Sequence, residues 1–173
     1  MKNIVLTGFM GTGKSTVGKK VAEKLDMKFI DMDSYIENKL GMTISDIFLN
    51  KGEPYFREIE KEAAKELSRF TGTVIATGGG IVLNSENIKN FRENGIVICL
   101  KADVDTILRN VSCSQERPLL KQGNVRSTIE KLLEYREPYY KNNDYEVDVS
   151  ILTVEQAASV IGDIYTNKKN NNK

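Results

Sequence analysis

Three glycines near the start of the chain precede a lysine and a serine, and these residue types suit phosphate binding. The segment GFMGTGKST matches the pattern G-x4-G-K-[ST], with Lys14 and Ser15 as its last two positions. Glycines let successive N–H groups turn toward phosphate oxygens, and a lysine neutralises the β- and γ-oxygens. A plain glycine-rich turn is the alternative. The full match, set between an expected strand and an expected helix, favours a P-loop.

A P-loop assigns roles to most of its own side chains and N–H groups. Lys14 is expected to be catalytic, the Ser15 hydroxyl to ligate Mg²⁺, and Thr16 to contact the α-phosphate. The nucleotide would be ATP. The predicted ATP contacts in this segment are Gly11, Thr12, Gly13, Lys14, Ser15 and Thr16.

Two carboxylates follow the next expected strand, at residues 28–31. Asp31 and Asp33 stand two positions apart where that strand ends, and ligands bind along the carboxyl edge of a parallel sheet. Asp31 is therefore predicted to face the metal, and Asp33 to face the group that accepts the phosphate. The alternative for Asp33 is that it caps a helix over residues 34–40.

Three consecutive glycines, Gly78–Gly80, follow the expected strand 73–76. Such a run is costly as a mere linker, because each glycine loses much conformational freedom on folding. It permits a ligand to approach the backbone closely and to take hydrogen bonds from N–H groups. A simple turn is the alternative.

Short β-branched runs alternate with longer amphipathic stretches along the whole chain. Strands are expected at residues 3–7, 28–31, 73–76, 96–100 and 145–149, and helices at 15–25, 53–69, 85–93 and 127–140. This alternation predicts an α/β fold of three layers, with a parallel sheet covered on both faces.

The length of 173 residues and the absence of repeats or flexible linkers predict one domain over residues 1–166. Residues 113–126 break the helical periodicity, and a lid is expected at about 113–124. Residues 167–173 are expected to form a disordered polar tail.

Composition narrows the function further. The chain has no histidine, so acid–base work falls to carboxylates or lysine, and Cys99 and Cys113 are expected to be free thiols without a catalytic role. A net charge of +1 does not point to nucleic acid or to an anionic membrane. Without a signal peptide or a long apolar run, the protein is expected in the cytoplasm. It is also expected to be a monomer.

Six segments taken in order, GFMGTGKST, FIDMD, GEPYFREIE, ATGGG, ERPLL and YREPYY, closely resemble the shikimate kinase family. The resemblance covers roughly residues 1–164. It implies a nucleoside-monophosphate-kinase-like P-loop fold with a five-stranded sheet in the order 2-3-1-4-5. It also implies transfer of the γ-phosphate of ATP to the 3-hydroxyl of shikimate, a step of aromatic amino-acid biosynthesis.

The resemblance further implies where the substrates bind. The acceptor site would comprise Asp33, Arg57, Gly79 and Arg136, and Mg²⁺ would be held by Ser15 and, through water, by Asp31. It also implies that Arg117 in the lid is catalytic and contacts the phosphates, and that Arg109 lies beside the adenine. The segment after Val149 departs from the family pattern, since Ile151 stands where relatives carry a polar or basic residue.

The residue chemistry agrees with an acidic acceptor. A guanidinium pairs with a carboxylate in bidentate fashion, so Arg57 and Arg136 could orient and neutralise the acid. Taken singly, each arginine would more often form a surface salt bridge.

Three other functions fit the sequence less well. A regulatory GTPase would need a DxxG switch segment, and no Asp here is followed three places later by Gly. A gluconate-type kinase would need a His-Pro motif, which a chain without histidine lacks. A non-catalytic ATP-binding module would be expected to lose Lys14, Asp33 or the arginine of the lid, and all three are present.

Overall fold

The computed structural model describes residues 1–112 and 124–170 of the chain. Five strands form one parallel sheet in the order β2-β3-β1-β4-β5. The strands are β1 (Asn3–Gly8), β2 (Lys28–Asp31), β3 (Thr73–Ala76), β4 (Gly95–Lys101) and β5 (Tyr145–Asp148). The fold class and the strand order predicted above are confirmed.

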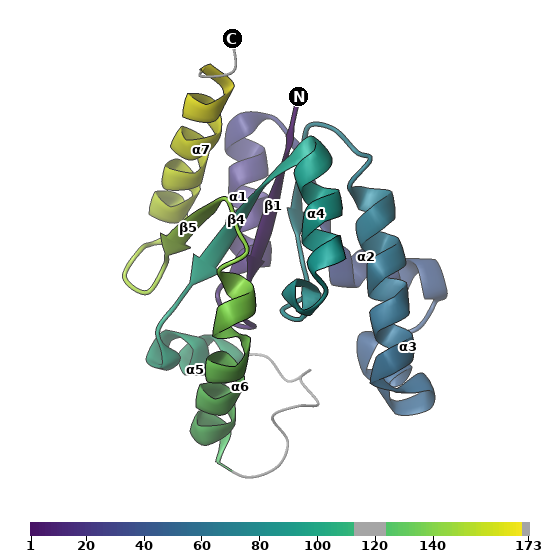
Figure 1. Cartoon of the computed structure of the whole chain (residues 1–173). Helices are drawn as coiled ribbons and strands as arrows, with labels where there is room; N and C mark the ends of the chain where they lie inside the picture. The colour runs from purple at the N-terminus through teal and green to yellow at the C-terminus, as the bar shows by residue number, and fades with distance from the viewer. Residues whose placement is uncertain (113–123, 171–173) are drawn as a thin grey trace.

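Helices surround the sheet as the alternating sequence pattern predicts (Figure 1). They are α1 (Lys14–Leu25), α2 (Met32–Leu40), α3 (Ile44–Leu67), α4 (Ser85–Asn94), α5 (Val104–Ser112), α6 (Val125–Tyr140), α7 (Val154–Asn170) and the short 3₁₀ helix η1 (Ile81–Leu83). None of these helices is both long and apolar enough to span a bilayer in the ranges that the structure describes.

Each face of the sheet has its own buried core. Val5, Val97 and neighbouring residues pack with helices α2, α3 and α4 on one face. Ile4, Ile96 and their neighbours pack with α1 and α7 on the other. Successive residues of a strand point to opposite faces, so β1 and β4, buried on both sides, carry Ile, Val and Leu side chains toward both cores.

The carboxyl ends of the strands point toward the lower part of Figure 1, where α5, α6 and one end of α3 lie. The P-loop begins there, between β1 and α1. The sheet therefore delivers the sequence motifs that follow β1, β2 and β3 to one edge, as parallel topology requires.

Helix α3 differs from its predicted range of 53–69. It begins at Ile44 and is interrupted at Gly52, whose φ of 82° and ψ of 167° lie outside the helical region. Pro54 suits the first turn of the helical segment that follows, because its missing N–H is not needed there. The sequence signals at residues 52–54 therefore mark a kink within one long element.

The carboxyl-terminal helix also runs further than predicted. Helix α7 continues to Asn170, so residues 167–170, assigned above to a disordered tail, are helical. Lys168 lies over the ring of Tyr145, with Nζ 5.3 Å from the ring centroid. This contact with β5 favours the last turn of the helix, and it depends on a residue distant in the sequence.

Candidate active site

The P-loop connects β1 to α1 and has the backbone geometry that its glycines allow. Gly11 and Gly13 have φ angles of 78° and 82°, and Gly13 is the N-cap of α1. Lys14 is buried, and its Nζ donates hydrogen bonds to the carbonyl oxygens of Gly8 and Phe9, both at 2.8 Å. The loop thus holds the ammonium group beside the N-terminus of a helix, where phosphate oxygens bind favourably.

The other predicted side chains of the loop differ in their exposure to solvent. Ser15 and Thr16 are exposed at the start of α1, where a phosphate or a cation could reach their hydroxyls. Thr12 is buried, and its hydroxyl donates to the carbonyl oxygen of Phe9 at 2.8 Å. The Thr12 side chain therefore fixes the loop, and a contact with ATP would fall to its backbone.

Helix α5 packs directly on this loop. The side-chain amide of Asn110 donates to the carbonyl oxygen of Gly11 at 2.7 Å, and a Cβ on Gly11 would lie 2.8 Å from Cγ2 of Val111. Arg109 is the residue before Asn110; it is exposed, and Nη2 donates to the hydroxyl of Thr106 at 3.0 Å. Arg109 thus lies near the P-loop, as the prediction of a nucleotide contact requires.

Asp31 connects the P-loop to the end of β2. One carboxylate oxygen accepts a hydrogen bond from the Ser15 hydroxyl at 2.5 Å. The other accepts from the N–H groups of Asp33 and Ser34, so Asp31 is the N-cap of α2. The alternative reading of Asp33 as the cap is therefore wrong, because the helix begins earlier, at Met32.

The glycine run after β3 allows three charged side chains to approach the backbone closely. A Cβ on Gly78 would lie 3.0 Å from Oδ1 of Asp33 and 3.1 Å from Oε1 of Glu60, and one on Gly80 would lie 2.3 Å from Nη1 of Arg57. Any larger residue would displace these groups. In this structure the groups that approach the glycines are side chains of the protein, and the approach of a ligand stays a prediction.

Glu60 lies between positive and negative groups in this cluster. Its side chain is 3% exposed and accepts a hydrogen bond from Nη1 of Arg57 at 2.8 Å, while Arg57 also pairs with Glu53 at 2.9 Å. Burial raises the pKa of the Glu60 carboxyl, and the charge of Asp33 adds to that effect, whereas Arg57 and Arg136 oppose it. Asp33, Arg57 and Arg136 are thus all close enough to Glu60 to affect the pKa of its carboxyl.

Arg136 is buried without a complete set of partners. Its residue is 6% exposed, its guanidinium carbon lies 5.9 Å from the centroid of the Phe9 ring, and Nε donates no hydrogen bond to any described residue. A buried guanidinium with an unsatisfied N–H is costly unless an anion binds it. Together with Arg57, this side chain suits a ligand with a carboxylate.

Comparison with known proteins assigns the chain to a family. The model of the family described as shikimate kinase matches residues 10–165. The shikimate kinase of Caldanaerobacter subterraneus is 53% identical over 93% of this chain and 94% of its own length. That of Thermoanaerobacter pseudethanolicus is 50% identical over 98% of this chain and 99% of its own.

This chain belongs to the shikimate kinase family. The resemblance inferred from six sequence segments is confirmed.

Solved structures agree with this family and with its fold. The structure of the shikimate kinase from Acinetobacter baumannii in complex with shikimate matches with a TM-score of 0.92 and 35% identity, covering 98% of this chain and 95% of that one. A gluconokinase from Sinorhizobium meliloti, at 16% identity and a TM-score of 0.59, shares the fold alone. As a member of the shikimate kinase family, the chain is an ATP-dependent small-molecule kinase.

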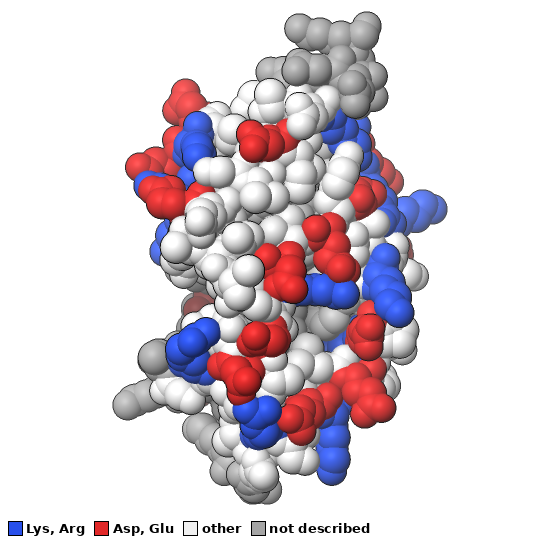
Figure 2. Space-filling model, turned by 90° about the vertical axis from the view of Figure 1, so that its left-hand side faces the viewer, with Lys and Arg blue, Asp and Glu red and all other residues white. Residues whose placement is uncertain are grey.

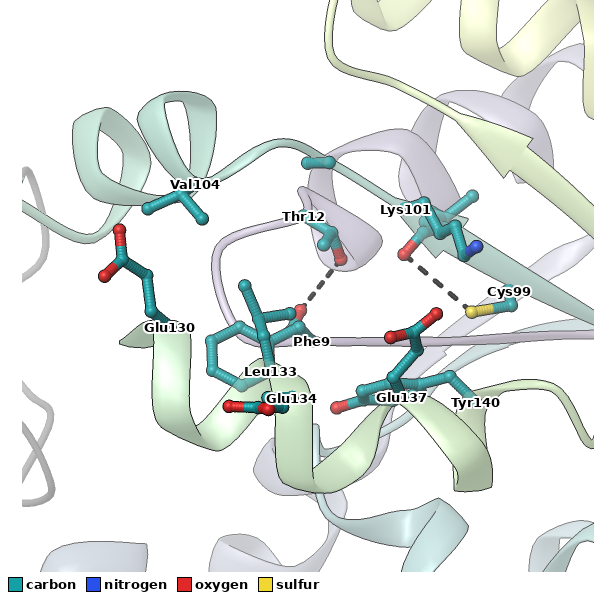
Figure 3. A pocket seen from close by; sticks show the side chains of 12 residues that line it. Phe9, Thr12, Cys99, Lys101, Val104, Glu130, Leu133, Glu134, Glu137 and Tyr140 are labelled. Carbon is teal, nitrogen blue, oxygen red and sulfur yellow. Dashed lines mark hydrogen bonds between the residues drawn. The ribbon is translucent and has the colours of Figure 1, made fainter. Parts of the chain in front are cut away.

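A cavity of about 370 Å³ lies between the P-loop, the end of β4 and α6 (Figure 3). Phe9 and Thr12 line it from the loop, and Leu133, Glu137 and Tyr140 line it from α6. The residues that this shikimate kinase family member is expected to use for its acceptor are not among the lining residues. Phe9 and Tyr140 connect the cavity to the acceptor residues, because Phe9 lies beside Arg136 and Tyr140 is hydrogen-bonded to Gly79.

Two predicted residues cannot be placed. Arg117, with the lid predicted at 113–124, lies outside the described residues except for Asn124, which caps α6. Cys113 also lies outside them. Cys99 is a free thiol buried in β4, where burial raises its pKa to about 11, so it is a poor nucleophile as expected.

The sequence analysis missed three residues of this region. Glu60, Asn110 and Tyr140 each bind a predicted site residue or the backbone of one: Arg57, Gly11 and Gly79 respectively. Glu60 had a signal, because it stands three positions after Arg57 on one helix, where side chains meet. Asn110 and Tyr140 form hydrogen bonds with residues that are distant in the sequence, so no local sequence pattern indicates them.

Proposed function

We propose that this chain transfers the γ-phosphate of ATP to the 3-hydroxyl of shikimate, giving shikimate 3-phosphate and ADP. The observation that carries the proposal is the pair of guanidinium groups, Arg57 and buried Arg136, which share the neighbour Glu60, with Arg136 over the ring of Phe9 in the P-loop. Membership of the shikimate kinase family supports the same reaction, and the related Acinetobacter protein binds shikimate.

In this mechanism the protein holds the acceptor by its carboxylate. Arg136 offers an N–H without a partner among the described residues, and Arg57 offers a guanidinium whose charge is partly satisfied by Glu53 and Glu60. Two guanidinium groups orient a planar carboxylate and neutralise it. Gly79 would contribute backbone hydrogen bonds to the ring hydroxyls.

Asp33 then serves the reacting hydroxyl. A bond forms between the acceptor oxygen and the γ-phosphorus while the bond from phosphorus to the β,γ-bridging oxygen breaks, leaving ADP. The proton of the hydroxyl passes to the carboxylate of Asp33. Phosphoryl transfer depends mainly on positioning and electrostatic stabilisation, so Lys14 and the N–H groups of Gly11, Thr12 and Gly13 matter by holding the phosphates.

The donor atoms at the P-loop fit Mg²⁺. Ser15 and Asp31 bring a hydroxyl and a carboxylate oxygen within 2.5 Å, and Mg²⁺ prefers oxygen ligands. No cluster of three or more His, Cys, Asp or Glu side chains occurs in the described ranges, so most ligands would come from phosphates and water. When bound, Mg²⁺ would neutralise developing charge on the β- and γ-oxygens.

The remaining assignments are proposals from the family resemblance. Arg117 would contact the transferring phosphate from the lid, while Arg109 and Thr16 would contact the nucleotide. We also propose a monomer that acts in the cytoplasm without a nucleic-acid partner. The absence of a nucleic-acid partner is supported by the net charge of +1 and by the face in Figure 2, where Lys and Arg are interspersed with Asp and Glu.

An assay with a panel of acceptors tests the reaction. The purified chain, ATP and Mg²⁺ are mixed with shikimate, quinate, gluconate or a nucleoside monophosphate, and ADP release is coupled to NADH oxidation. Shikimate is expected to give the highest kcat/KM, with activity lost when EDTA removes the metal. Higher turnover of gluconate or of the nucleotide, with none on shikimate, would contradict the proposal.

A further inference from the structure

Tyr140, the last residue of α6, makes a hydrogen bond that the proposed mechanism has not used. Its hydroxyl donates to the carbonyl oxygen of Gly79 at 2.6 Å, although the two residues are 61 positions apart. Tyr140 is 5% exposed. The bond therefore ties the carboxyl end of α6 to the middle of the glycine turn.

This bond fixes the direction of a backbone donor. The carbonyl of Gly79 and the N–H of Gly80 belong to one planar peptide and point from its opposite edges. Among the residues that the structure describes, the N–H groups of Gly78, Gly79 and Gly80 donate to no backbone carbonyl. Holding the carbonyl thus sets the orientation of donors available to a ligand.

Arg136 lies near the same side chain, four residues earlier on α6. Burial raises the pKa of Tyr140, and the positive charge of Arg136 opposes that rise. Tyr140, hydrogen-bonded to the glycine turn, is thus also a neighbour of the arginine that lacks a partner for Nε among the described residues.

The Tyr140 ring belongs to the buried core and also borders a cavity. Tyr140 and Phe9 both line the cavity of about 370 Å³ in Figure 3. The guanidinium carbon of Arg136 lies 5.9 Å from the centroid of the Phe9 ring. A ring that borders a cavity has fewer packing contacts on that side, so the hydrogen bond to Gly79 contributes to its position.

We propose that Tyr140 is a positioning residue for the acceptor, whose hydroxyl aligns the Gly79–Gly80 peptide. This inference rests on the proposed function, because it assigns the N–H groups of the glycine turn to the binding of shikimate. Tyr140 does not touch the reacting atoms and acts through Gly79.

The test is Tyr140→Phe, which removes only the hydroxyl. We expect the KM for shikimate and its Kd by calorimetry to rise about three- to tenfold, the range of one net hydrogen bond. The KM for ATP is expected to change less than about twofold, because Lys14 and the P-loop donors keep their geometry.

Tyr165→Phe is the matched control. Tyr165 is also buried, at 7% exposed, and its hydroxyl donates to a backbone carbonyl, that of Lys2, at 3.0 Å. It packs with the core on the other face of the sheet. This variant should lose a similar amount of thermal stability while the KM for shikimate stays at the wild-type value.

The outcomes separate this inference from the proposed function. Absence of shikimate turnover by the wild-type chain would refute the function. Normal wild-type turnover with an unchanged shikimate KM in Tyr140→Phe, or with equal rises for shikimate and ATP, would overturn the positioning role alone. So would an equal rise of the shikimate KM in Tyr165→Phe.

Replacing Tyr140 by 4-aminophenylalanine provides a second variant that keeps a donor at the same place. If the hydroxyl acts by its hydrogen bond, this variant should fold and bind shikimate within about threefold of wild type. A folded 4-aminophenylalanine variant with shikimate affinity as poor as that of Tyr140→Phe would count against the proposal, even if Tyr140→Phe itself were unstable.

Discussion

Asp33 and Glu60 both approach Gly78, but their surroundings give the two carboxylates different roles. Glu60 is almost fully buried and hydrogen-bonded to Arg57. Asp33 is partly exposed in the first turn of α2, and the cap of that helix is Asp31. Glu60 is thus suited to holding a guanidinium, whereas Asp33 is accessible to an acceptor hydroxyl.

Asp33→Asn tests the role of that charge. Asparagine keeps the size and a hydrogen bond but cannot take the proton, so kcat should fall about 10²-fold or more, the scale of a lost general base. ATP affinity and the melting temperature should stay close to wild type, because Asp33 does not cap α2. Steady-state kinetics and a thermal melt measure both.

Asp26→Asn is the control for the same chemical change away from the site. Asp26 ends α1 with a φ of 52°, a conformation that asparagine also tolerates, at the helix end opposite the P-loop. Its kcat should be unchanged. A kcat for Asp33→Asn as high as that of this control would remove Asp33 from the chemistry.

Residues of the site differ in how far the sequence could predict them. Lys14 and Ser15 are defined by a contiguous motif, so their geometry follows from a local segment. Glu60 stands in a helix rich in charges, where an Arg–Glu pair three positions apart would normally be a solvent-exposed salt bridge. Its burial, at 2% exposed, arises only when α3 packs beside the glycine turn.

At the scale of elements, the turn between β3 and η1 positions the charged cluster. Gly80 has a φ of −97°, which any residue can adopt, so its need for glycine comes from the neighbouring Arg57. A methyl group there would lie 2.3 Å from Nη1 of Arg57. The turn therefore needs a glycine at position 80 because the Arg57 side chain from α3 packs against it.

Gly80→Ala should displace Arg57 without straining the backbone. Since displacements of about 1 Å can cost on the order of 10²-fold, kcat/KM for shikimate should fall by roughly that factor, mainly through KM. The KM for ATP should be nearly constant. Product formation at varied shikimate and fixed saturating ATP, and the reverse, measures the two constants.

Gly162→Ala serves as the control for adding a methyl group. Gly162 lies in α7, where the nearest atom to a new Cβ is Cδ2 of Leu25 at 3.8 Å, an ordinary contact. Alanine favours a helix, so the melting temperature should hold or rise while the kinetics stay unchanged. Unaltered shikimate kinetics in Gly80→Ala would mean that Arg57 can move without consequence.

The boundaries of elements were predictable where local signals agree with packing. The five strands were expected within about one residue of their observed ends. For β1, β3 and β4 the reason is that buried runs rich in β-branched residues suit the interior of a parallel sheet. Residues 44–51 of α3 were missed, since Gly52 and Pro54 signal a helix start and the kink between them depends on tertiary packing. The last turn of α7 was missed for the same kind of reason.

At the scale of the whole molecule, the two cores are joined through the sheet. Neighbouring residues of β1, Ile4 and Val5, belong to opposite core clusters, and the same is true of Ile96 and Val97 in β4. Loss of either core would leave the central strands covered on one face only. The two faces are therefore expected to unfold together.

We therefore expect one cooperative thermal transition, with equal calorimetric and van't Hoff enthalpies.

Shikimate at 100 times its Kd should stabilise the folded state by about 2.7 kcal/mol. For a chain of this size that corresponds to a rise in melting temperature of about 5–10 °C. Arg136→Leu should abolish most of this rise, because it removes the guanidinium proposed to bind the carboxylate, yet the rise caused by ATP should persist. Differential scanning calorimetry of both proteins, with each ligand alone, measures these shifts. Two resolved transitions would contradict the coupling of the cores, whereas a full shikimate shift in Arg136→Leu would contradict only the assigned role of that arginine.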